Sequence, residues 1–180
     1  MKKLVALCTL VVALVCTTAV SAQFSGLDNS PADIAAYPAS GQVPNKLVKV
    51  IYSRPQLKGR SLSELAPNGQ VWRTGANEAS EITFYKDVTF GGKSIKAGSY
   101  SLFTIPSEKE WTVILNKKLN QWGAYSYDPS ADVVRVTASV SKNETPIEAF
   151  SIGYQEVDSA IHLLMGWSDV KVAVPIVAAL

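Results

Sequence analysis

The chain has 180 residues, of which 47% are hydrophobic, and it carries 17 basic and 15 acidic side chains, one histidine and two cysteines. Two of the lysines and both cysteines lie in residues 1–22, so the remaining 158 residues hold equal numbers of basic and acidic groups and no cysteine. Because nucleic-acid binding draws on clustered Lys and Arg, this balance argues against a nucleic-acid-binding protein. The absence of cysteine after residue 22 excludes disulfides and thiol chemistry there, and the length fits one domain.

Residues 1–22 have the pattern of a secretory signal peptide. Two lysines precede an apolar run at residues 4–15, and small residues at 20–22 form a cleavage site. We therefore expect an exported chain that begins at Gln23, periplasmic or extracellular, with no transmembrane segment after the signal is removed. A lipoprotein modified at Cys16 is disfavoured, because the bulky Val15 stands where such signals have a small residue.

Residues 23–45 are predicted to form an extended arm or loop, because Pro31, Pro38, Gly41 and Pro44 interrupt any periodicity. Residues 46–180 are predicted to form one all-β domain, an antiparallel β-sandwich of about eight or nine strands with a jelly-roll or immunoglobulin-like arrangement. No stretch between the strands has a sustained helical stripe of apolar residues. The predicted strands are residues 47–53, 70–74, 81–90, 98–105, 111–116, 133–140, 147–154, 160–167 and 170–177.

Two turns are specific enough to predict. Gly91 and Gly92 can supply the positive φ angles of a tight hairpin. Ser168 and Asp169 are expected to turn the last pair of strands back on itself.

Five ordered blocks resemble a known family of exported bacterial domains, mostly from Gram-negative species, that carries only a label of unknown function. The blocks are YSRPQLKGR (52–60), VWRTGANEA (71–79), AGSYSLFTIP (97–106), WTVILN (111–116) and QWG (121–123). The resemblance extends from about residue 30 to the C-terminus. It implies export, a single compact domain and no agreed activity. Glu81 and Ser99 depart from the usual pattern, where a neutral polar residue and a threonine are expected.

The block at residues 72–78 is the most unusual local sequence, because Arg73, Asn77 and Glu78 crowd around Gly75. A glycine turn there would let backbone N–H groups and these side chains converge. Arg73 could then hold a carboxylate or phosphate while Glu78 accepts from a hydroxyl or amine. Alternatively, Arg73 pairs with Glu78 internally and Asn77 caps a turn, which local reasoning favours somewhat.

Arg54 and Arg60 would strengthen the ligand-binding interpretation if they folded onto the same side as Arg73. Three arginines near a single acid would leave a net positive charge for an anionic ligand.

A second candidate region is residues 121–128, where Trp122 and Tyr125 lie among hydrogen-bonding groups. Flat rings beside such groups suit sugars or peptide side chains. The alternative is that Trp122 plugs one end of the sandwich while Tyr125 and Tyr127 alternate along a short strand.

Catalytic and metal sites receive weaker support. His162 is the only histidine and lies in an apolar strand, and no G-x-S-x-G motif marks an activated serine. One histidine without cysteine excludes an ordinary zinc site, whereas Asp128 and Asp132 are weak candidates for calcium.

Glu78 and Glu81 could form a glycosidase pair. Their odd spacing on a strand would place them on opposite faces.

Three functions remain open. The first is a non-catalytic module that binds a carbohydrate, peptide or small organic anion through Arg54, Arg60, Arg73, Asn77, Glu78, Trp122 and Tyr125. The second is a metal-independent hydrolase or isomerase that uses Glu78 as acid or base and Arg73 as electrostatic stabiliser, with no cofactor. The third is a cell-envelope assembly domain that pairs with another chain through the 23–45 arm or an exposed strand.

Overall fold

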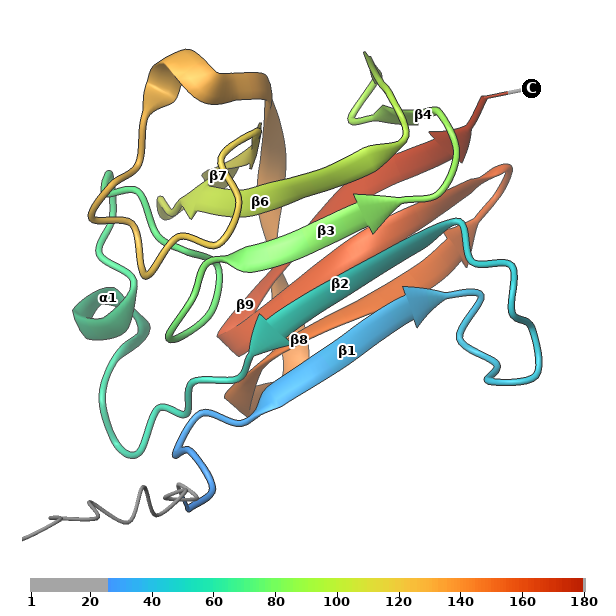
Figure 1. The fold of residues 1–180 in the computed structure, drawn as a ribbon. Coiled ribbons are helices and arrows are strands. Elements are labelled where there is room, and N and C mark those ends of the chain that lie inside the picture. The colour runs from blue at the N-terminus through green and yellow to red at the C-terminus, as the bar shows by residue number, and fades with distance from the viewer. Residues whose placement is uncertain (1–25, 180) are drawn as a thin grey trace, which may run out of the picture.

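Nine antiparallel strands form one continuous sheet in the computed structural model, which describes residues 26–179 (Figure 1). The strand order is β1-β2-β3-β6-β7-β8-β9-β4-β5. The all-β antiparallel class predicted from the sequence is therefore confirmed. The strands are β1 (Ala32–Tyr37), β2 (Val48–Ser53), β3 (Ser80–Phe84), β4 (Val88–Phe90), β5 (Lys93–Ile95), β6 (Gly98–Ile105), β7 (Glu110–Asn116), β8 (Asp132–Val157) and β9 (Ala160–Ala178); the helices are α1 (Leu62–Leu65) and the 3-10 turn η1 (Pro129–Ala131).

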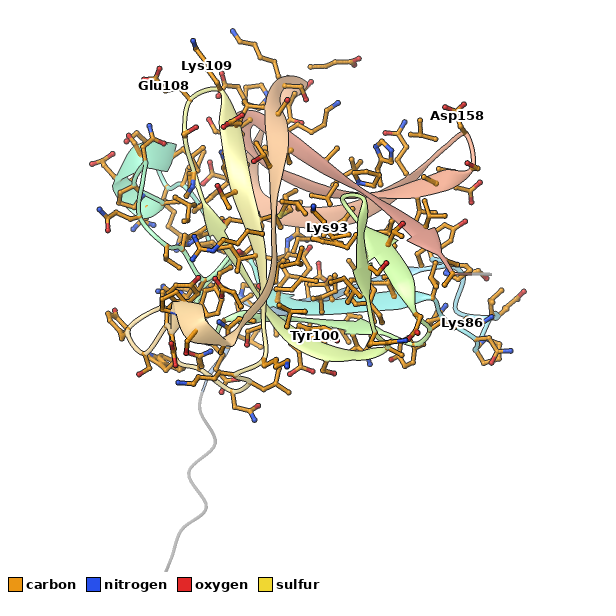
Figure 2. All side chains as sticks on the ribbon, turned by 90° about the horizontal axis from the view of Figure 1, so that it is seen from above. Lys86, Lys93, Tyr100, Glu108, Lys109 and Asp158 are labelled. Carbon is orange, nitrogen blue, oxygen red and sulfur yellow. The ribbon has the colours of Figure 1, made fainter. Side chains whose placement is uncertain are left out.

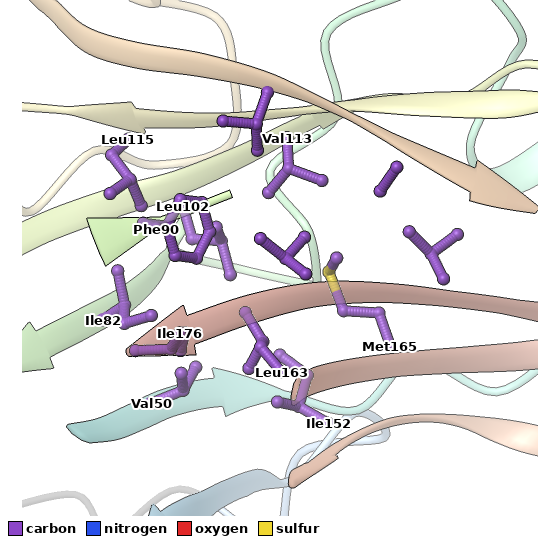
Figure 3. Packing of buried hydrophobic residues seen from close by; sticks show 14 of the residues in the cluster. Val50, Ile82, Phe90, Leu102, Val113, Leu115, Ile152, Leu163, Met165 and Ile176 are labelled. Carbon is purple, nitrogen blue, oxygen red and sulfur yellow. The ribbon is translucent and has the colours of Figure 1, made fainter. Parts of the chain in front are cut away.

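The long strand β8 joins the two halves of the sheet. Its residues 132–139 pair with β7, and its residues 140–157 pair with β9. In Figure 1, β8 and β9 pass behind β1, β2 and β3. Tyr52 of β2 meets Phe150 of β8 edge to face, with ring centroids 5.8 Å apart. Side chains from both halves thus fill the same core (Figure 3).

Buried and more exposed side chains alternate along β2, which shows which face of the sheet is covered at this strand. Val48, Val50 and Tyr52 are buried in the core, so their neighbours Lys49, Ile51 and Ser53 lie on the other side of the strand. We call that side the outer face; across the strand register it also carries Ile34 of β1 and Glu81 of β3.

The predicted glycine hairpin is confirmed. Gly91 and Gly92 connect β4 to β5 with φ values of 55° and 80°, and Phe90 pairs with Lys93 across the turn. Exposed charged residues mark other connections: Figure 2 shows Lys86 after β3, Glu108 and Lys109 between β6 and β7, and Asp158 at the β8–β9 hairpin.

The predicted turn at Ser168 and Asp169 is wrong, because β9 continues through both residues. Ser168 has a φ of 55°, and the β8–β9 register shifts opposite it. The Asn143 amide of β8 donates to the carbonyl oxygens of Ser168 and Val170, at 3.2 and 2.8 Å. A side chain therefore satisfies backbone groups where the ladder is irregular, and the strand does not end.

Other predicted boundaries also change. Residues 133–140 and 147–154 belong to one strand, β8. Residues 70–74 form no strand, and Trp72 makes only an isolated bridge to Thr104. The predicted arm contains β1, which pairs with β2. Helix α1 was not anticipated, although Ser61 and Glu64 form a capping box at its start.

The expected export signal, residues 1–22, lies outside the described residues. Across residues 26–179, neither helix combines the length and the apolar character needed to span a bilayer.

Candidate functional site

A cleft of about 370 Å³ lies on the outer face, where β2 ends and β3 begins. Its floor includes Ile51 and Glu81, which are direct partners across the strand register and therefore lie side by side. The residues lining it are Asp28, Ala32, Ile51, Tyr52, Ser53, Asn77, Glu78, Ala79, Glu81, Asn120 and Trp122.

Backbone hydrogen bonds join two loops, which together form one wall of the cleft. Glu78 and Trp122 form an isolated antiparallel bridge. Ala79 N donates to Gln121 O at 2.8 Å, and Gly123 N donates to Asn77 O at 2.9 Å. These bonds bring Trp122 next to Glu78, although 44 positions separate them in the sequence.

The loop before β3 is shaped by close packing at Gly75. A Cβ atom there would lie 2.9 Å from Ser80 Oγ and 3.0 Å from Ser53 O. The left-handed residues are Thr74 and Asn77, with φ values of 53° and 59°. The expectation of a glycine turn is therefore wrong: Gly75 permits the loop to approach β2, and its neighbours make the bend.

The segment before β1 also lines the cleft, through Asp28. Ser30 N donates to Asp28 Oδ1 at 2.6 Å. This bond, and a second one from the Asn77 side chain, lower the pKa of Asp28 below its usual value. The carboxylate is therefore ionised at neutral pH.

The cleft has an acidic, acceptor-rich lining with one aromatic wall. Asp28, Glu78 and Glu81 contribute carboxylates, and within residues 26–179 its lining holds no Lys, Arg or His. Trp122 is 64% exposed, so the alternative in which it plugs an end of the sandwich is wrong. Such a lining suits hydrogen-bond donors and cations, while the indole offers a flat apolar surface.

Arg54 does not line the cleft, because it ties β1 and β2 to β8. Its guanidinium donates to Asp33 Oδ2 at 3.1 Å, to Phe150 O at 3.1 Å and to Ser151 Oγ at 2.7 Å. These partners occupy its Nε and both terminal nitrogens.

The other two predicted arginines also lie outside the lining. Arg60 folds back on its own loop and donates to the carbonyl oxygens of Leu57 and Gln56, both at 3.0 Å. Arg73 is half-buried, and its Nε finds no acceptor within the described residues. Nor does Arg73 pair with Glu78 within 26–179. The structure thus brings together Asn77, Glu78 and Trp122 of the predicted set.

The remaining aromatic candidate, Tyr125, is 84% exposed and lies outside the cleft lining. Its ring lies over Gly123, where a Cβ atom would be 2.8 Å from the ring.

The weak calcium candidates are engaged by protein donors. Asp128 caps η1 through Ser130 and pairs with Lys118 at 2.7 Å. Asp132 accepts from Asn116, Tyr127 and Arg135. Within residues 26–179, no three His, Cys, Asp or Glu side chains are arranged so that they could hold a metal ion.

His162, the other weak candidate, lies in β9 opposite Gln155 and outside the cleft lining.

Comparison with known proteins places the chain in a family. Residues 30–176 match the model of the family described as "Protein of unknown function (DUF2911)". The chain belongs to this family. The matched range contains every lining residue of the cleft except Asp28. No curated protein and no solved structure matches the chain.

In this family member, sequence reasoning missed Asp28, Ile51 and Asn120 and discounted Glu81. Glu78 and Glu81 line the same cleft and do not lie on opposite faces of a strand, because Glu78 precedes β3 and the strand alternation does not reach it. Ile51 could have been recognised from the sequence, because it is an apolar residue between Lys49 and Ser53 on the polar side of β2. Asp28 could not, since it lies in a segment without periodicity.

Proposed function

We propose that this domain is an exported, non-catalytic carbohydrate-binding module whose cleft holds a sugar against Trp122. The observation that carries the proposal is the exposed indole of Trp122 beside three carboxylates, in a lining without basic residues. Amino sugars are the favoured ligands, because they combine hydroxyl donors with a positive charge.

The aromatic wall supports a ring-shaped ligand. Stacking a sugar on an indole buries a large apolar area at small entropic cost, since Trp has few rotatable bonds. The volume of about 370 Å³ lies within the range of small-molecule sites.

The polar lining supports selectivity by charge. Carboxylates and side-chain amides accept hydrogen bonds from sugar hydroxyls, and an ammonium group gains a charge-assisted bond. An acidic sugar or another organic anion would place like charges together in the same cleft. The arginines that suggested an anionic ligand lie elsewhere, so the charge of the lining favours cationic ligands instead.

Calorimetric titration with three matched oligosaccharides tests the proposal: a glucosamine oligomer, its N-acetylated form and a uronic-acid oligomer. We expect affinity to fall in that order. Trp122→Ala should abolish binding, whereas Tyr125→Ala, which removes a more exposed ring outside the cleft, should not. Glu81→Gln should reduce the preference for glucosamine over its N-acetylated form.

Two results would overturn the proposal. One is the absence of binding for all three oligosaccharides at millimolar concentration. The other is unchanged binding by a folded Trp122→Ala variant. Binding of a basic peptide alone would assign the cleft to a different ligand.

A second candidate function is glycoside hydrolysis, since Glu78 and Glu81 line the same cleft. Such enzymes use two carboxyl groups, one as acid and one as base or nucleophile. Prolonged incubation of the wild type with the same oligosaccharides, followed by product analysis, tests it. Cleavage that is lost in Glu78→Gln would replace the binding module with an enzyme.

A further inference from the structure

Strand β1 lies at one edge of the sheet, and within residues 26–179 no strand pairs with its outer side. Arg54 N donates to Pro31 O at 3.0 Å, which places the backbone groups of the odd-numbered residues toward β2. The N–H and C=O groups of Ala32, Ile34 and Ala36 therefore face away. Consistently, Ile34 N donates to the neighbouring side-chain atom Asp33 Oδ1, at 2.8 Å, and not to β2.

Between Pro31 and Pro38, this edge lacks the usual protection against pairing. Exposed edge strands commonly carry lysine, proline or a bulge. Within Ala32–Tyr37 there is no lysine and no proline, and the register with β2 runs without a shift. The one charged residue, Asp33, is held by Arg54.

The outer face beside the edge is apolar. Ile34 is 61% exposed and lies directly opposite Ile51, which is 42% exposed. Around the same edge, a groove of about 760 Å³ between β1 and the end of β8 is lined mostly by apolar residues, including Ile152 and Tyr154. Apolar surface thus adjoins this strand edge on both sides.

We propose that two copies of this chain pair β1 to β1, antiparallel about a twofold axis at Ile34. Ile34 would lie opposite the partner subunit's Ile34, and Ala32 opposite the partner subunit's Ala36. The sheet then continues from one chain into the other.

The register follows from the backbone orientation. In a pairing centred on Ile34, only even-numbered residues form hydrogen bonds between the chains, so every outward N–H meets an outward C=O. The Ile34 N–H exchanges its side-chain acceptor for a backbone carbonyl. On the outer face, the isoleucines at 34 and 51 of both chains form one apolar row of four, with small alanines on either side.

Sedimentation of the chain beginning at Gln23 tests the association. We expect a dimer, and Ile34→Lys should raise its dissociation constant about tenfold or more, because two like charges then lie directly opposite. Val177→Lys is the matched control: Val177 is an exposed, β-branched residue, but it lies in β9 and is paired with Thr89. A wild type that stays monomeric up to 100 µM would overturn the proposal, as would equal weakening by both variants.

Cysteine cross-linking tests the register independently. Both natural cysteines precede Gln23, so in the chain that begins at Gln23 a single introduced cysteine is the only thiol that can form a cross-link. Ile34→Cys places the two thiols on directly opposed residues about 5.5 Å apart between Cα atoms, a span that a disulfide can bridge. Ala36→Cys places them four residues apart along the strand, about 14 Å. We expect a covalent dimer from Ile34→Cys only; dimers from both variants, or from neither, contradict this register.

Discussion

Trp72 stacks on Trp167, with ring centroids 5.4 Å apart and planes inclined by 17°. Trp72 belongs to no regular strand and is fixed by a double hydrogen bond with Thr104, at 2.7 and 2.9 Å. Its ring also meets Trp111 of β7 and Phe150 of β8 edge to face. Trp72, in the VWRTGANEA block, therefore anchors the loop that forms the cleft wall to the core.

Trp72→Ala should lower the free energy of unfolding by about 3–5 kcal/mol, the usual cost of deleting a buried aromatic side chain. Trp72→Phe should cost less, because it keeps part of the packing. Urea unfolding followed by circular dichroism measures both. Trp122→Ala is the control, since this exposed side chain should change stability by no more than about 0.5 kcal/mol. Equal losses at both positions would contradict the assigned packing.

Gly75→Ala should destabilise the domain by about 1–3 kcal/mol, because the new Cβ would press on the Ser53 backbone. Gly153→Ala is a matched substitution where no atom lies within 4 Å of the new Cβ. It should leave stability unchanged or raise it by about 0.4–1 kcal/mol, because alanine restricts the unfolded chain. Thermal unfolding of the two variants checks the difference. If both behave alike, close approach is not the reason for glycine at 75.

Arg54→Met should reduce stability by about 1–2 kcal/mol through loss of three hydrogen bonds, with the figure limited by partial solvent exposure. Sugar binding should remain, because Arg54 does not line the cleft. Chemical unfolding and calorimetry on the same preparation separate the two effects. If Arg54→Met lost sugar binding but kept its stability, Arg54 would belong to the ligand site.

Stability should fall in acid partly through Asp128. A hydrogen bond from Lys118, followed by those from Ser130, lowers the pKa of Asp128 from 3.8 to about 2. The depressed pKa in the folded state means that this carboxylate stabilises the fold above pH 3.8 and loses its contribution as the pH falls toward about 2. Asp128→Asn should therefore be less stable than wild type at pH 6, with a difference that narrows below about pH 4.

Melting temperatures between pH 2 and 6 measure that difference. Lys118→Met should show the same narrowing, because it removes the hydrogen bond that contributes most to the lowered pKa of Asp128. If the difference in melting temperature between wild type and Asp128→Asn stayed constant from pH 2 to 6, Asp128 would act only as the cap of η1.

The sequence predicted strands well where alternation and turn chemistry agree. Residues 98–105 form β6 with the predicted bounds, and Gly91–Gly92 makes the predicted turn. Prediction failed at Ser168, where two polar residues resemble a turn. The partner that keeps β9 extended, Asn143, lies in another strand, and local sequence does not reveal it.

The cleft was predictable only in part for the same reason. Glu78 and Trp122 stood out locally, but their contact depends on the pairing of two loops. Arg54 stood out equally, and its partners at 150 and 151 are distant in sequence. Whether an arginine serves a ligand or the fold is decided by which strands lie beside it, and a single sequence does not specify that neighbourhood.

Strand β8 has a consequence for cooperativity. The first part of β8 pairs with β7 and its remainder pairs with β9. Unfolding of either half of the sheet therefore removes a pairing partner from the other half. The chain should therefore unfold in a single transition. It should also refold slowly for its size, because β4 must pair with β9 at the far end of the sequence, where Val88 lies opposite Ala178.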